Sequence, residues 1–136
     1  MSVIVTDKGF QVDDFACGFV TRDEAAANDC DYGIDLPSDT APDALAGLNN
    51  APMIRIDFPS SADGRGFTLA AMLRKAGYKG RQRAKGHILA DQYAMARRSG
   101  FDEVEIDETL AARQPEDQWL FRANWQDHNY QSRLRG

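Results

Sequence analysis

Ionisable side chains alternate with apolar ones along three short runs between residues 54 and 107, and they place groups that could do chemistry side by side. Asp57, Arg83, Lys85 and Glu105 contribute carboxylate, guanidinium and ammonium groups to these runs. A lysine held near carboxylates and other cations can have its pKa displaced, which is one way enzymes obtain a base or a Schiff-base nucleophile. The same pattern also predicts a layer of ion pairs that fills one face of a sheet.

A glycine-flanked turn, formed by Asp63, Gly64, Arg65 and Gly66, lies between a predicted strand and a predicted helix. Ligands of parallel α/β proteins bind at such junctions. Glycines let backbone N–H groups turn inward and a helix start adds partial positive charge, so the turn favours an anion. Arg65 could grip a sulfo, phospho or carboxylate group. The alternative is that Asp63 caps the helix or holds Arg65 in a structural pair.

Three further polar residues, His87, Asp91 and Gln92, follow the second run. His87 is placed at the end of a predicted strand, where it could titrate near neutral pH, although a lone histidine is commonly structural. Asp91 and Gln92 open a predicted helix, where a carboxylate suits the helix dipole and capping is the simpler role. All three are candidate ligand-binding residues.

The elements that position these residues follow from apolar periodicity and turn signals. Strands are predicted over residues 2–6, 10–12, 32–36, 53–58, 82–88 and 102–107. Helices are predicted over residues 21–28, 44–48, 67–76, 90–98 and 115–127. Beyond residue 30 the strands and helices alternate, and this succession forces the strands to pair in parallel.

The predicted fold is one α/β domain with an N-terminal β-hairpin and arm (1–30), a parallel α/β core (31–127) and a polar tail (128–136). Parallel strands that are covered on both faces normally read as unbroken apolar runs. Because these strands alternate with charges, we expect helices on one side only, as in a partial barrel or a two-layer sheet with one polar face. The alternative is an open doubly wound sheet with helices on both faces.

Charge is distributed unevenly along this chain, whose formal net charge is −5. Residues 1–64 hold three cations and twelve acids, residues 65–98 nine cations and one acid, and residues 99–136 four cations and eight acids. The basic middle predicts an anionic ligand, an acidic partner surface or internal ion pairs with the flanks. The acidic pI of about 4.9 and the absence of a recognised reading motif argue against nucleic-acid binding.

Several other classes of protein are excluded by the residues. No run approaches the ~18 apolar residues of a membrane span. Residues 1–14 lack the basic start and apolar core of a secretory signal, so we expect a cytoplasmic protein. Cys17 and Cys30 are too far apart for a redox pair, and neither is grouped with His87 or His128 at metal-ligand spacing. No metal site is predicted.

A dense series of short motifs occupies the segment from Phe58 to Asp102. It reads F-P-S-S-A-D-G-R-G-F-T, then L-R, G-Y-K-G, R-A-K-G-H-I-L-A-D-Q and R-S-G-F-D. This series resembles the signature of the DUF934 family of bacterial proteins over about a third of the chain. Members of that family lie near sulfite-reduction genes and are described as probable oxidoreductases of sulfite reduction. The resemblance therefore implies a role in sulfur assimilation.

Two positions depart from the family's signature. Many members have an aspartate where this chain has His87, and many have a cysteine where it has Ser99. A catalytic thiol at residue 99 is excluded here, so the resemblance does not carry a thiol-based redox role to this chain.

Two functions from different classes are predicted. The first is an oxidoreductase-like component of assimilatory sulfite reduction, in which the Asp63–Gly66 turn with Arg83 and Lys85 holds a small sulfur oxyanion. The second is a non-catalytic accessory protein that docks through Arg81 and Arg83 on a sulfite reductase or its electron donor. The residues identify no cofactor. The candidate partners are a sulfite reductase or redox partner protein, a small anion and a second copy of the chain.

Overall fold

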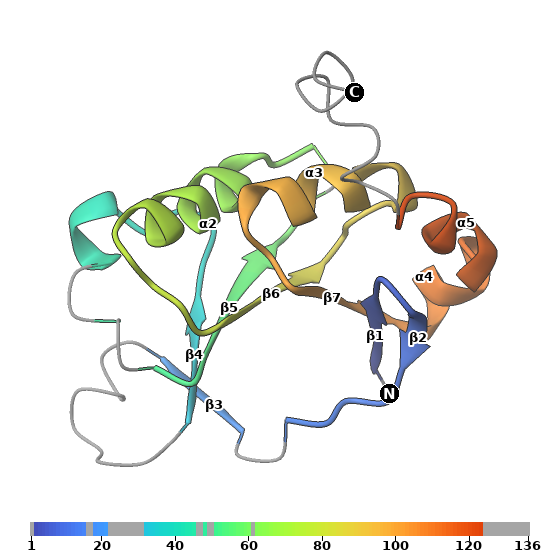
Figure 1. Ribbon diagram of the computed structural model, residues 1–136, viewed down its shortest axis with the longest axis horizontal. Coiled ribbons are helices and arrows are strands. Elements are labelled where there is room, and N and C mark those ends of the chain that lie inside the picture. Colours follow the sequence, from blue (N-terminus) through green and yellow to red (C-terminus); the bar gives the residue numbers. More distant parts are fainter. Residues whose placement is uncertain are drawn as a thin grey trace, which may run out of the picture.

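Five parallel strands in chain order form the centre of the computed structural model, and two longer helices lie along one face of them (Figure 1). The structure describes residues 2–15, 18–21, 32–45, 48, 51–60 and 62–123. The strands are β1 (Ser2–Thr6), β2 (Gly9–Gln11), β3 (Phe19–Thr21), β4 (Gly33–Leu36), β5 (Met53–Phe58), β6 (Arg81–Gly86) and β7 (Glu103–Asp107). They form one sheet in the order β2-β1-β7-β6-β5-β4-β3.

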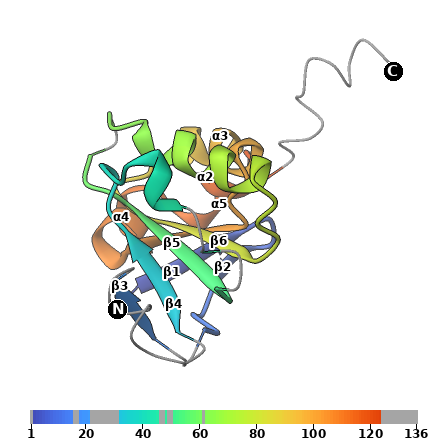
Figure 2. The same ribbon diagram turned by 90° about the vertical axis from the view of Figure 1, so that its left-hand side faces the viewer.

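The helices cover one face of this sheet. They are α2 (Arg65–Lys75), α3 (Tyr93–Ser99), α4 (Glu108–Arg113) and α5 (Glu116–Leu120), with 3-10 turns η1 (Pro42–Leu45) and η2 (Ala90–Gln92). Figure 1 and the turned view of Figure 2 place α2, α3 and η1 on the same side of the strands. The parallel strands follow chain order without a reversal, so the expected two-layer sheet with one polar face is confirmed. The sheet is open rather than closed into a barrel, and it is not doubly wound.

Side-chain alternation in the central strands explains this arrangement. In β5, Ile54, Ile56 and Phe58 are buried on the helix side, where they meet apolar residues of α2. Arg55 alternates with them and points to the opposite face, where its register partner on β6 is Arg83. The period of two therefore separates an apolar face under the helices from a charged face below the sheet.

The N-terminal hairpin is confirmed, and it makes one pairing that the sequence did not predict. β1 pairs antiparallel with β2, as expected of a hairpin. β1 also pairs antiparallel with β7, so that Val5 lies opposite Val104. Val5 is fully buried and extends the core beyond the parallel strands. The hairpin is thus an integral edge of the sheet.

Several predicted helices differ from those observed. The helix expected over residues 21–28 is wrong at its start because Thr21 ends β3, and residues 22–28 lie outside the described residues. A 3-10 turn over Pro42–Leu45 stands where a helix was expected over residues 44–48. The expected final helix is limited to α5 within the described chain, and the sequence did not predict α4. Pro115 separates them because the residue before a proline is disfavoured in the helical region.

No helix of the described residues is both long and apolar enough to cross a membrane.

Candidate functional site

The charged face below the sheet is organised around Arg83, whose side chain is 0% exposed. Arg83 Nε donates to Glu103 Oε2 at 2.7 Å, and Arg83 Nη1 donates to Glu105 Oε1 at 2.9 Å. Burial alone would lower the pKa of Arg83, but its hydrogen bonds with Asp13 and Glu103 and their charges raise that pKa above its usual value. Arg83 is therefore held as a cation inside an ion-pair layer.

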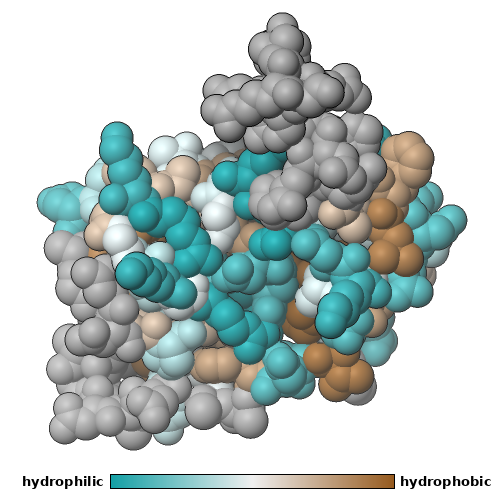
Figure 3. Space-filling model, in the orientation of Figure 1, coloured by the Kyte–Doolittle hydropathy of each residue, from teal (hydrophilic) through white to brown (hydrophobic). Residues whose placement is uncertain are grey.

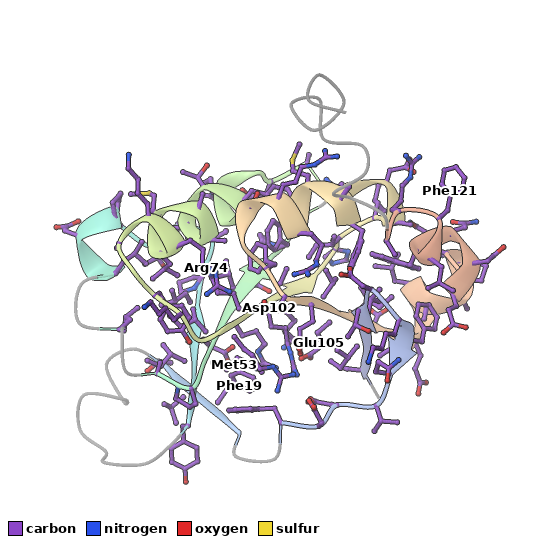
Figure 4. The ribbon with its side chains drawn as sticks, in the orientation of Figure 1. Phe19, Met53, Arg74, Asp102, Glu105 and Phe121 are labelled. Carbon is purple, nitrogen blue, oxygen red and sulfur yellow. The ribbon has the colours of Figure 1, made fainter. Side chains whose placement is uncertain are left out.

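Arg55 extends the same layer toward β4. Its Nε donates to Asp35 Oδ1 at 2.6 Å, and its Nη1 donates to Glu105 Oε1 at 3.1 Å. The Arg55 guanidinium carbon lies 3.6 Å from the centre of the Phe19 ring, close enough for a cation–π contact. Figure 4 shows Phe19 and Glu105 on the side of the sheet away from α2 and α3. Glu105 thus joins two arginines through one oxygen.

A segment between β2 and β3 covers part of this layer. Asp13 accepts from both terminal nitrogens of Arg83, at 2.9 and 3.1 Å. Asp14 accepts from Arg81 Nη2 at 2.9 Å, and Arg81 also pairs with Glu103. The hydrogen bond from Arg83 lowers the pKa of Asp13 below its usual value. The internal ion pairs that the sequence left as an alternative are present on this face.

Lys85 and Asp57 lie on the same face, nearer the carboxyl ends of their strands. Both residues are exposed, and in the sheet register Lys85 lies between Asp57 and Glu105. Within the part of the chain that the structure describes, the Lys85 ammonium group has no ion-pair partner. The strands therefore bring Asp57, Arg83, Lys85 and Glu105 onto one face as predicted, but only Arg83 and Glu105 of the four are locked in the ion-pair layer.

A cavity of about 220 Å³ opens beside Lys85, at the carboxyl ends of β6 and β7. We call it the carboxyl-edge cavity; its polar lining includes Ser2, Lys85, His87, Glu105, Thr109 and Arg113. The carboxyl ends of parallel strands are where α/β sheets bind ligands. It joins three residues that the sequence analysis named, Lys85, His87 and Glu105, with four polar side chains that it did not single out, those of Ser2, Asp107, Thr109 and Arg113.

Two local features shape the walls of the carboxyl-edge cavity. Gly86 has a φ of +119°, and a Cβ there would come 2.5 Å from the carbonyl oxygen of Phe58. His87 N donates to that same oxygen at 3.0 Å, which turns the chain at the end of β6. On the other side, Asp107 caps α4 by accepting from Leu110 N at 2.7 Å.

The short helix α4 then supplies two lining side chains. Thr109 and Arg113 are four residues apart, the spacing that places side chains on the same side of a helix, and both line the cavity. No described residue forms an ion pair with Arg113. Lys85 and Arg113 thus bring two unpaired cations to a space that also holds His87.

The negative charge of Glu105 at the cavity wall is largely balanced by two arginines of the ion-pair layer. Glu105 lies in the wall, but Arg55 and Arg83 both donate to its Oε1. The Glu105 carboxylate is therefore already balanced by two arginines, and it cancels less of the positive charge of Lys85 and Arg113 than an unpaired acid would. Lys85, Arg113 and the His87 ring can donate hydrogen bonds into the cavity, and Asp107 is the one further carboxylate in its lining, so the two unpaired cations favour a small anion.

The turn predicted to bind an anion lies at a separate place. Arg65 Nε and Nη2 donate to the two oxygens of Asp63 at 3.0 and 2.8 Å, and Nη2 also donates to Ser38 at 3.2 Å. The hydrogen bond from Arg65 lowers the pKa of Asp63 well below its usual range. Gly64 occupies the N-cap of α2, and none of these residues lines the carboxyl-edge cavity. This is the structural pair that the sequence left open, and the anion site at this turn stays a prediction.

Asp91 and Gln92 make local contacts in the turn before α3. Asp91 accepts from Arg122 Nη2 at 3.0 Å. Gln92 Oε1 accepts from Leu89 N at 2.9 Å, which holds the 3-10 turn η2. Neither residue lines the cavity. The contact of Gln92 matches the capping role, whereas Asp91 forms an exposed ion pair with Arg122.

The sequence predicted neither the pairing of β1 with β7 nor the helix α4. It therefore could not single out Ser2, Thr109 and Arg113. A partial signal existed for the last two, since they closely follow the carboxyl end of a strand expected to be parallel.

Among the described residues, no group of three or more histidine, cysteine, aspartate or glutamate side chains could hold a metal ion. Cys17 and Cys30 lie outside those residues.

A family model matches residues 33–136, more than half of the chain, and its description reads "Bacterial protein of unknown function (DUF934)". The chain therefore belongs to this family. No curated protein and no solved structure matches the chain significantly. The matched region contains Lys85, His87 and Arg113, whereas Ser2 precedes it.

Proposed function

We propose that this DUF934 member is a component of assimilatory sulfite reduction that binds a small sulfur oxyanion in its carboxyl-edge cavity. One observation carries the binding site: Lys85 and Arg113 lie unpaired, within the described chain, around the same cavity as His87. The link to sulfite rests on the family resemblance. The proposed location is the cytoplasm.

The size of the cavity supports a small ligand. Its volume of about 220 Å³ is below the ~300–1,000 Å³ that is typical of pockets for larger organic ligands. An oxyanion with three or four oxygens and a few waters would fill such a space. The cavity is therefore better suited to an inorganic anion than to a nucleotide or a flavin.

The lining residues have separate roles in this proposal. The Arg113 guanidinium can donate two parallel hydrogen bonds to neighbouring oxygens, whereas Lys85 supplies a compact charge. His87 adds a ring N–H donor. The protein holds and orients the oxyanion, and a redox partner protein supplies the electrons, which makes the role oxidoreductase-like.

Isothermal titration with sulfite, sulfate and phosphate tests the binding site. We expect at least one of these anions to bind the wild type, and the Lys85→Ala/Arg113→Ala variant to bind it at least about tenfold more weakly, since tenfold corresponds to about 1.4 kcal/mol. Lys79→Ala is the matched control because Lys79 is an exposed lysine at the opposite ends of the strands. Absence of heat with every anion would remove the proposal.

A second candidate function is a non-catalytic docking protein for a sulfite reductase or its electron donor. Figure 3 shows hydrophilic side chains across the centre of the face seen in Figure 1. Near the amino ends of the strands, Lys75 and Lys79 are exposed and have no ion-pair partner among the described residues. Such cations suit an acidic partner surface.

Arg83 takes no part in this docking surface because it is fully buried. The docking contact expected of Arg83 is not carried into this proposal, because Asp13 accepts hydrogen bonds from both of its terminal nitrogens. Co-purification tests the docking function: Lys75→Glu/Lys79→Glu should lose the reductase, while Lys85→Glu should retain it. Equal recovery of the reductase with the wild type and with both variants would rule out this docking surface.

A further inference from the structure

We infer that the ligand of the carboxyl-edge cavity is a protonated oxyanion, one that carries an O–H group of its own. This inference rests on the proposed function, because it specifies which anion the cavity selects. Its basis is a set of hydrogen-bond acceptors, formed by Ser2, Glu105 and Asp107, that lines the cavity together with the cations.

Toward the cavity, the Ser2 hydroxyl can only accept hydrogen bonds. Its Oγ donates to Glu105 Oε2 at 3.1 Å. A serine hydroxyl has a single proton, so the remaining capacity of this oxygen is its lone pairs. Glu105 accepts in all of its hydrogen bonds with described residues, because Arg55 donates to both of its oxygens and Arg83 donates to Oε1. A ligand atom that contacts Ser2 Oγ must therefore donate.

Asp107 provides a second acceptor beside Ser2. The two residues are register partners across β1 and β7, so they lie next to each other at the sheet edge. Asp107 Oδ1 accepts from Leu110 N, whereas Oδ2 accepts no hydrogen bond from any described residue. A bare anion oxygen placed here would face a carboxylate oxygen without a proton between them.

The cavity thus combines two kinds of wall. Lys85, His87 and Arg113 can donate to anionic oxygens, while Ser2 and Asp107 require a donor. Ser2 and Asp107 are exposed and can accept from water, and a fully deprotonated anion that displaces this water offers them no proton in return, which lowers its affinity. Hydrogensulfite or another protonated oxyanion satisfies both walls at once.

Hydrogenphosphate and sulfate are the probes that isolate this effect. At mildly alkaline pH both are tetrahedral and carry two negative charges, but only hydrogenphosphate has an O–H group. Titration of the full chain should give hydrogenphosphate an affinity at least about tenfold higher than that of sulfate. Equal affinities would overturn the inference while leaving the anion site standing. Failure of both anions and of sulfite to bind would overturn the proposed function as well.

Asp107→Asn tests the acceptor directly. An amide keeps an oxygen that can cap α4 and adds N–H donors, so sulfate should bind this variant more tightly and the preference for hydrogenphosphate should shrink toward unity. Asp57→Asn removes the same charge from an exposed position on β5 that does not line the cavity. It should preserve the preference. A preference that is unchanged in Asp107→Asn, or lost equally in both variants, would overturn the assignment.

Discussion

Arg83 and Asp13 are 70 residues apart in the chain, yet both terminal nitrogens of Arg83 donate to the Asp13 carboxylate. The contact ties the segment after the N-terminal hairpin to the middle of the parallel sheet. It also covers a guanidinium that already pairs with Glu103 and Glu105. The charged face is therefore held together by contacts between the acidic and basic parts of the sequence.

The Asp13 contact should make stability depend on pH. Because Arg83 lowers the pKa of Asp13 below 3.8 in the folded protein, the stabilisation is complete above that value and is lost as the pH falls through the lower, folded value. Asp13 is 37% exposed, so the effect is at most about 1 kcal/mol. Urea unfolding should show wild type more stable than Asp13→Asn at neutral pH, with the gap closing below about pH 4. A gap that does not change with pH would contradict this account.

Removing Arg83 should cost far more than removing a neighbouring cation. Arg83→Ala leaves Glu103 and Glu105 as buried carboxylates, each with one arginine fewer, and we expect the free energy of unfolding to fall by about 3 kcal/mol. Denaturant unfolding measures the loss.

Lys85→Ala is the matched control, since Lys85 lies two positions further along β6 on the same face but is exposed. It should change stability by no more than about 0.5 kcal/mol. Equal stability of the two variants would show that the ion-pair layer contributes nothing.

Gly86 should tolerate no side chain. Its φ of +119° disfavours any L residue, and an added Cβ would press on the Phe58 carbonyl, which accepts from His87 N. We expect Gly86→Ala to lower the free energy of unfolding by about 2 kcal/mol or more. Gly64→Ala is the control because φ there is −90° and nothing lies within 4 Å of the added Cβ. It should cost less than about 1 kcal/mol. Similar losses at both glycines, measured by urea unfolding, would refute this explanation.

The parts of the fold that could be predicted from the sequence are those governed by local periodicity. The alternation of Ile54 and Ile56 with Arg55 predicted both β5 and its charged face. The apolar spacing of Leu69 and Leu73 predicted α2. Each signal lies within one element, so no distant contact was needed to read it.

The remaining features depend on contacts between distant residues. The hairpin pattern of β1 predicts its pairing with β2, but nothing local specifies its second pairing, with β7. The cavity could not be predicted for the same reason, because Ser2 reaches it only through that pairing. The helix α4 is six residues long and packs only Leu110 and Ala111 against the core, which is too short a stretch to show helical periodicity in the sequence.

Amide chemical-shift mapping during a sulfite titration tests the central claim most directly. Binding in the carboxyl-edge cavity predicts the largest shift changes at Gly86, His87 and residues 107–110, with little change in Lys85→Ala/Arg113→Ala. Changes centred on Asp63 and Arg65 would move the site to the helix entrance. Spectra that sulfite leaves unchanged at every residue would contradict the account.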